Sequence, residues 1–91
     1  MTVENWYGLP MSLVVMEMDL ETPASEEQIE GMKAATEVCF EVNGVERKQT
    51  YLSADRKRFI CVCEARDVES VRRALESAKI PYGTIYGATV F

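Results

Sequence analysis

The spacing of apolar residues changes in a fixed order along this chain, and that order limits the possible folds more than any other feature of the sequence. Residues 12–20 (SLVVMEMDL) alternate at a period of two, which predicts a strand. Residues 25–42 carry their apolar side chains at helical spacing instead. The remaining predicted elements are a strand at 45–53, a strand at 58–65, a helix at 67–79 and a strand at 83–91.

Polar residues at the expected helix ends support these assignments. Ser25 is followed three residues later by Gln28, which is the spacing of a capping box at a helix start. Asp67 is a good N-cap for the second helix. The pair Asn43-Gly44 supplies the left-handed stop of the first helix.

The order strand, helix, strand, strand, helix, strand predicts an α+β protein with the ferredoxin-like split βαβ-βαβ fold. In that fold two helices cover one face of a four-stranded antiparallel sheet. The nearly continuous apolar run at 58–65 predicts a central strand, and the more polar 45–53 predicts an edge strand. With 91 residues we expect one domain at 12–91, preceded by an N-terminal arm at 1–11.

Composition excludes several classes of function. A net charge of −5 argues against nucleic-acid partners, because phosphate backbones would repel the chain. No signal-peptide pattern is visible at the N-terminus, and the longest uninterrupted apolar run, 59–63, is too short to cross a membrane. Three cysteines, an odd number, fit a reducing compartment, so a cytoplasmic location is expected.

Alternation within the strands assigns side chains to the two faces of the predicted sheet. Phe59, Cys61 and Cys63 form the more apolar face of their strand, which we expect beneath the helices together with Val14, Met16 and Met18 of the first strand. The opposite face carries Leu13, Val15, Glu17, Ile60, Val62 and Glu64. Because an uncovered face with four aliphatic side chains is unusual for a monomer, we predict a homodimer with two sheets facing each other, as in dimeric α+β barrels.

Such a dimer would enclose a cavity between the sheets, and this cavity is the predicted site. Glu17 and Glu64 are candidate general acids or bases, with Tyr51 as a third catalytic candidate. The candidate ligand-binding residues are Val15, Ile60, Val62, Arg47 and Tyr86. The alternative is that both glutamates lie at solvated strand ends, paired with Arg58 or Arg47.

Other motifs point to structure rather than to chemistry. Cys61-Val62-Cys63 is interpreted as a pair of buried thiols, because residues two apart on a strand cannot form a normal disulfide. The chain contains no histidine, which excludes Cys–His and Ser–His–Asp catalysis. It also lacks phosphate-loop glycines and the aromatic platforms of RNA-binding sheets. No cofactor and no metal site are predicted.

Residues 50–75 (TYLSADRKRFICVCEARDVESVRRAL) resemble the bacterial domain-of-unknown-function 4242 family. The similarity extends over about 12–88, with Thr50 where serine is common and Arg66 where proline is common. The residues that match family motif positions are Glu17, Tyr51, Asp55, Cys61 and Glu64. The resemblance implies a ferredoxin-like fold and a dimer, and some members are labelled nickel-binding.

Three functional hypotheses follow, in order of preference. The first is a small dimeric accessory protein that binds an apolar small molecule between its sheets. The second is a cofactor-independent isomerase, cyclase or oxygenase that uses Glu17 or Glu64 as its general acid or base. The third is a metal-binding protein, with nickel as the metal.

Overall fold

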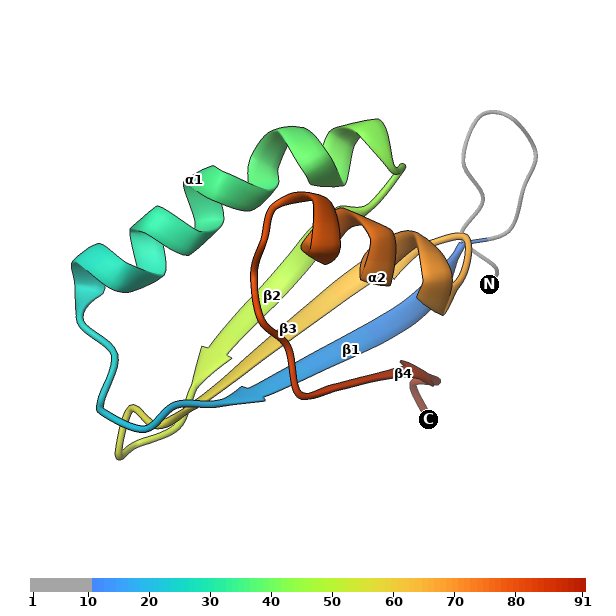
Figure 1. Cartoon of the computed structure of the whole chain (residues 1–91). Helices are drawn as coiled ribbons and strands as arrows, with labels where there is room; N and C mark the ends of the chain where they lie inside the picture. Colours follow the sequence, from blue (N-terminus) through green and yellow to red (C-terminus); the bar gives the residue numbers. More distant parts are fainter. Residues whose placement is uncertain (1–10) are drawn as a thin grey trace.

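The structure, a computed structural model, describes residues 11–91 and contains the six predicted elements in the predicted order (Figure 1). They are strand β1 (Ser12–Asp19), helix α1 (Glu26–Val42), strands β2 (Glu46–Leu52) and β3 (Arg58–Ala65), helix α2 (Val68–Ser77) and strand β4 (Thr84–Ala88). The predicted arm at 1–11 lies outside the described residues, apart from Met11.

The four strands form one sheet in the order β2-β3-β1-β4, and every neighbouring pair is antiparallel. Strands β1 and β3 are central and β2 lies at an edge, as their composition predicts. Both helices lie on the same side of the sheet, and within residues 11–91 no helix lies on the other side (Figure 1). The predicted ferredoxin-like α+β fold is therefore confirmed.

The helix starts have the predicted caps. At α1 the Gln28 amide donates to Ser25 Oγ at 3.1 Å, and the Ser25 amide donates to Gln28 Oε1 at 2.8 Å, which completes the capping box. At α2 the Ser70 amide donates to Asp67 Oδ1 at 2.8 Å. The hydrogen bonds from Ser70 also lower the pKa of Asp67.

Both helices end in the same hydrogen-bonded motif, although their sequences differ there. At the end of α1, Gly44 adopts a φ of 69°. At the end of α2, Lys79 takes the same left-handed position with a φ of 58°. In each case the next residue donates its amide to a carbonyl five positions back, from Val45 to Phe40 at 2.8 Å and from Ile80 to Leu75 at 3.0 Å.

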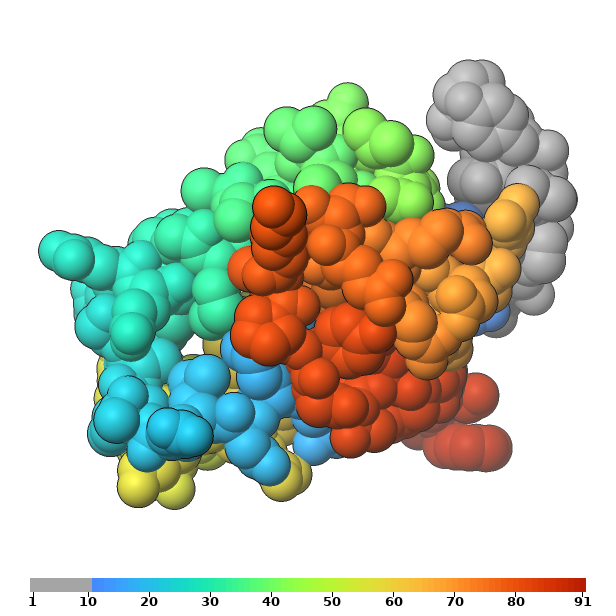
Figure 2. All heavy atoms as spheres, in the orientation of Figure 1, coloured from blue at the N-terminus to red at the C-terminus, as the bar shows by residue number. Residues whose placement is uncertain are grey.

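The core fills the layer between the sheet and the helices, and the packed view in Figure 2 shows the helices covering the sheet on that side. The buried residues of this layer are Val14, Met16, Met18, Phe40, Val45, Phe59, Cys61, Cys63, Ala65, Val71, Ala74 and Leu75. The face that alternation predicts beneath the helices is thus the buried one.

The turn between β2 and β3 is organised by Asp55. Its Oδ1 accepts hydrogen bonds from Ser53 Oγ at 2.6 Å and from the Lys57 amide at 3.0 Å. These bonds, the one from Ser53 first, lower the pKa of Asp55.

Strand β4 is shorter than the predicted 83–91. It ends at Ala88, which pairs with Leu13, one residue from the start of β1. The same register puts Thr89 opposite Ser12, the first residue of β1, so Val90 and Phe91 lie past the end of their partner strand and are exposed.

Candidate functional site

The face of the sheet opposite the helices, called here the open face, carries most of the predicted site residues. Its central row contains Val62 of β3 and Val15 of β1, which are partners in the ladder. Tyr86 of β4 is the partner of Val15 on the other side. In the next row Ile60 lies between Tyr51 and Glu17.

The aliphatic residues of the open face are only partly exposed. Val15 is 9% exposed, and Ile60 and Val62 are half-buried. The tyrosines on the flanking strands are more open, with Tyr51 53% and Tyr86 40% exposed. The open face is therefore a shallow apolar strip bordered by two aromatic side chains.

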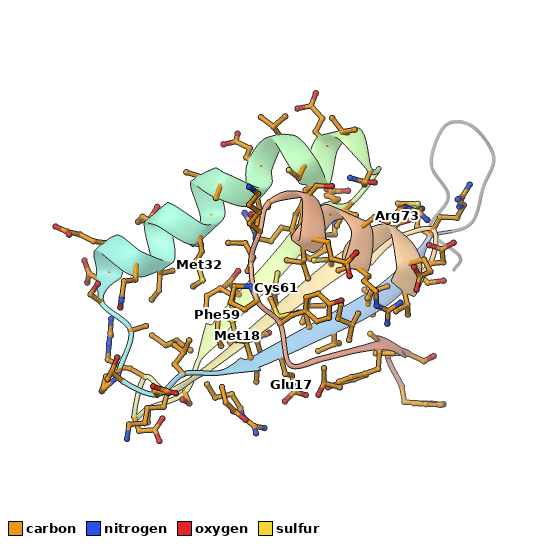
Figure 3. The ribbon with its side chains drawn as sticks, viewed as in Figure 1. Glu17, Met18, Met32, Phe59, Cys61 and Arg73 are labelled. Atoms are coloured by element: carbon orange, nitrogen blue, oxygen red, sulfur yellow. The ribbon has the colours of Figure 1, made fainter. Side chains whose placement is uncertain are left out.

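Glu17 anchors a polar cluster at one end of this strip. Arg58 donates from one guanidinium nitrogen to Glu17 Oε1 at 3.0 Å and from another to Asp19 Oδ1 at 3.1 Å. The Tyr86 hydroxyl donates to Glu17 Oε2 at 2.5 Å. Figure 3 shows Glu17 pointing away from the helices. Both oxygens of the Glu17 carboxylate are thus engaged by side chains of the same face.

The cluster holds Tyr86 in its protonated form. The hydrogen bond to the Glu17 carboxylate raises the pKa of Tyr86, because loss of the phenolic proton would place a second negative charge against the carboxylate. At neutral pH Tyr86 is therefore a fixed hydrogen-bond donor.

Glu64 lies at the other end of the strip and does not join this cluster. It is buried, and Lys48 contacts Glu64 Oε1 at 3.2 Å and Glu46 Oε1 at 3.3 Å. The two carboxylates raise the pKa of Lys48. Because Glu17 and Glu64 are separated by four residues along the ladder, they lie roughly 13 Å apart and do not form a carboxylate pair.

The prediction that Arg47 reaches the open face is wrong. Its guanidinium lies beneath the helices, 5.0 Å from the centre of the Phe40 ring, and donates to Thr36 Oγ1. The reason is a bulge in β2, where the pairing shifts between Arg47 and Gln49. Unbroken alternation would put Arg47 and Tyr51 on one face, and the extra residue at the bulge separates them.

A cleft of about 430 Å³ lies away from the open face, and no predicted site residue lines it. It is formed where the end of β1 meets the first turns of α1 and the segment after α2, on the side seen in Figure 2. Its apolar walls are Leu20, Ala24, Met32 and Ile80. Alternation does not reveal this cleft, because it depends on how the segments after β1 and after α2 pack against the first turns of α1.

The fold and the open face together define a class, the single-domain ferredoxin-like α+β protein whose sheet is covered by helices on one face only. The chain belongs to the SCO4226-like family, since the family model described as "Nickel responsive protein SCO4226-like" matches residues 15–87.

Among solved structures, the crystal structure of SCO4226 from Streptomyces coelicolor A3(2) is similar, with a TM-score of 0.79 and 15% sequence identity over 88% of this chain and 99% of that chain. At this identity the likeness shows the fold. The comparison with curated proteins gave no match. The description of the matching family refers to nickel, which agrees with the nickel label of some members of the family that the sequence resembles. The two families carry different names.

The donors of the described chain do not fit a nickel site. Within residues 11–91 there is no group of three or more His, Cys, Asp or Glu side chains placed to hold a metal ion, and the whole chain contains no histidine. Cys61 and Cys63 supply two sulfurs, but a four-coordinate site needs two further ligands. The carboxylates of Glu17 and Asp19 are already paired with Arg58, so they are poor candidates for those ligands.

None of the helices in the described part of the chain has the length and apolar character needed to span a membrane.

Two residues of the site were missed or undervalued at the level of the sequence. Arg58 is not among the predicted site residues, whereas it links two carboxylates. Lys48 is not among them either, although it is the one cation beside buried Glu64 in the described structure. The alternation of β3 places Arg58 on the open face, so its signal was present, but the position of Lys48 depends on the bulge.

Proposed function

We propose that this chain is a homodimeric binding protein that holds a small apolar molecule between two facing sheets. The observation that carries the proposal is the open face itself. An aliphatic strip, Val15, Ile60 and Val62, runs between two polar clusters, and no element of the described chain covers it. Burying such a strip against a second copy removes apolar surface from water.

The charges on the open face support a second copy as the occupant, because each charged group already has a partner within the face. Arg58 pairs with Glu17 and Asp19, and Lys48 pairs with Glu46 and Glu64. Covering the face therefore leaves no unpaired charge buried, which is the costly outcome. Four carboxylates face two cations in these pairs, so each copy carries an excess of negative charge. We expect added salt to strengthen the dimer by screening this repulsion.

The engagement of Glu17 favours binding over acid–base catalysis. A general base needs an oxygen directed at the proton it removes. In Glu17 one oxygen accepts from Arg58 and the other accepts from Tyr86. The same bonds fix both side chains for contact with a bound molecule: Arg58 keeps further N–H groups that can donate to it, and the phenolic oxygen of Tyr86, whose proton is given to Glu17, can accept from it.

A second candidate function is metal-dependent pairing with nickel. The family match over residues 15–87 and the excess of carboxylates on the open face favour it. Because one protomer does not provide a fitting set of donors, the ion would take its ligands from two copies.

Sedimentation velocity in EDTA and in Ni²⁺ separates these proposals. We expect a dimer in EDTA, and a folded monomer for Ile60→Lys. Val38→Lys is the matched control, because Val38 is 68% exposed on α1, away from the open face, and should leave the dimer intact. A dimer that forms only with Ni²⁺ would support the second candidate. A monomer under both conditions would contradict both.

The neutral dye Nile red tests for the bound apolar molecule. We expect the wild-type dimer to bind the dye and Ile60→Lys to lose that binding. Met32→Ala alters the cleft beside α1 and not the open face, so it should keep dye binding. If Met32→Ala loses dye binding and Ile60→Lys retains it, the dye binds in that cleft and the proposed site on the open face is wrong.

A further inference from the structure

The layer beneath the helices contains a polar cluster that the proposed function does not use. The sulfurs of Cys61 and Cys63 lie 3.5 Å apart, and both residues are buried. The Arg47 guanidinium lies in the same layer, held over Phe40 and hydrogen-bonded to Thr36. Figure 3 places Cys61 between the sheet and the helices, close to Phe59.

The cluster makes the two thiols unequal. The hydrogen bond from Cys63, assisted by the positive charge of Arg47, lowers the pKa of Cys61 to about 7. The same hydrogen bond, together with burial, raises the pKa of Cys63. Cys61 is therefore the thiol that carries negative charge, and Cys63 is its hydrogen-bond donor.

Cys61 borders a small hollow. Its volume is about 20 Å³, and its walls are six apolar side chains together with Cys61, Arg47, Thr36 and Lys33. A hollow of this size has room for one molecule of about the size of water. Thr50, the partner of Cys61 in the ladder, adds a buried hydroxyl oxygen that has no hydrogen-bond partner among the described residues. The sulfur is thus surrounded by a cation, two hydroxyl groups and a space for one small polar molecule.

We propose that Cys61 is an oxidation site for hydrogen peroxide, and that Arg47 and Cys63 are its positioning residues. The thiolate sulfur attacks one peroxide oxygen, and an S–O bond forms as the O–O bond breaks. Two electrons pass from sulfur to the peroxide. The departing hydroxide takes a proton from solvent and leaves as water, so the product is a sulfenic acid on Cys61.

Cys63 does not convert this product into a disulfide. The side chains of alternate residues on a strand start roughly 6.6 Å apart, whereas the Cβ atoms of a disulfide lie about 3.5–4.5 Å apart. The sulfenic acid therefore persists until an external thiol reduces it, and a trapping reagent can detect it.

The first experiment treats the full chain with hydrogen peroxide in the presence of dimedone, followed by peptide mass spectrometry. We expect the adduct on Cys61 before Cys39 or Cys63, with a rate that rises around pH 7. In the chain unfolded in urea this preference should disappear. An adduct on Cys39 first, or equal labelling of all three cysteines in the native chain, would overturn the proposal.

A matched pair of variants tests the role of Cys63. Cys63→Ser keeps a hydrogen-bond donor and should label at nearly the wild-type rate, whereas Cys63→Ala removes the donor and should label about tenfold more slowly. Arg47→Gln should likewise slow labelling and move the pH midpoint upward, which a merely structural role would not do. Cys39→Ser is the control that changes neither. Circular dichroism identifies any variant that fails to fold, and the wild-type pH profile then decides alone: a midpoint well above pH 7 contradicts the proposal.

Discussion

The two faces of this sheet are built from the same strands, yet they use polar residues in opposite ways. On the covered face Arg47 enters an apolar layer from the edge and is held by Phe40 and Thr36. On the open face the charged residues form ion pairs with one another, at both ends of an aliphatic strip. The covered face is completed by the chain's own helices, whereas the open face lacks such a cover in the described structure.

This difference predicts which measured property, folding stability or association, a substitution on each face should change. A change on the covered face removes contacts within one chain, so it should appear in the free energy of unfolding at any protein concentration. A change on the open face should appear mainly in association, because in the proposed dimer its apolar residues complete their burial against a second copy. The predictions below test that division.

The largest effect is expected for two neighbours on β3 that point to opposite faces. Phe59 is buried beneath the helices, so Phe59→Ala should lower the free energy of unfolding by about 3–5 kcal/mol. Ile60 is half-buried on the open face, so Ile60→Ala should cost only about 1 kcal/mol in dilute protein. Urea unfolding at low and high protein concentration measures both.

The concentration dependence is the sharper part of this test. The loss in Ile60→Ala should grow with protein concentration, since the variant forfeits dimer contacts, and the loss in Phe59→Ala should not. If both losses are independent of concentration, the open face is not an interface between copies.

The next effect compares two hydroxyl groups, each bonded to a charged side chain. Thr36→Val keeps the shape of the buried residue but removes the acceptor of Arg47, so it should lower the free energy of unfolding by about 1–2 kcal/mol. Tyr86→Phe removes the donor to Glu17 on the open face, where water replaces it, and should change stability less at neutral pH. An equal loss in the two variants would remove the contrast between the faces.

A smaller effect concerns the end of α2, which holds that helix over the covered face. The two helices end alike, but the left-handed position is Gly44 in one and Lys79 in the other. Lys79→Gly should raise the free energy of unfolding by about 0.5–1 kcal/mol, because a side chain at positive φ is strained. Gly44→Lys should lower it by a similar amount. Thermal unfolding measures both, and an unchanged midpoint in Lys79→Gly would show that no such strain is stored there.

The sequence predicts most of the fold because the fold rests on local signals. The alternation of β1 and β3 assigns the buried set correctly, and the capping residues Ser25 and Asp67 mark both helix starts. The end of α2 is different. The helix was predicted to extend to residue 79, but α2 ends two residues earlier, at Ser77, with Lys79 in a conformation that its residue type does not indicate.

The candidate site was less predictable because it depends on contacts between strands. Glu17 and Tyr86 are 69 residues apart in the sequence, and only the register of β1 and β4 brings them together. Arg47 was assigned to the wrong face because the bulge in β2 breaks the alternation, and no glycine in the strand indicates a bulge there.

The smallest effect is confined to alkaline pH and tests the Tyr86 cluster. The hydrogen bond to Glu17 raises the pKa of Tyr86 in the folded chain. Its stabilisation is therefore fully present below the unfolded value of about 10, and it is lost as the pH rises through the higher folded value. Wild type should lose stability between these pH values more steeply than Tyr86→Phe, in urea unfolding from pH 8 to 11. Glu17→Gln should remove the difference, because an amide acceptor carries no charge to oppose the phenolate. If the slopes of wild type and Tyr86→Phe coincide, the Glu17 carboxylate does not hold the phenolic proton, and Tyr86 is not fixed on the open face to contact a bound molecule.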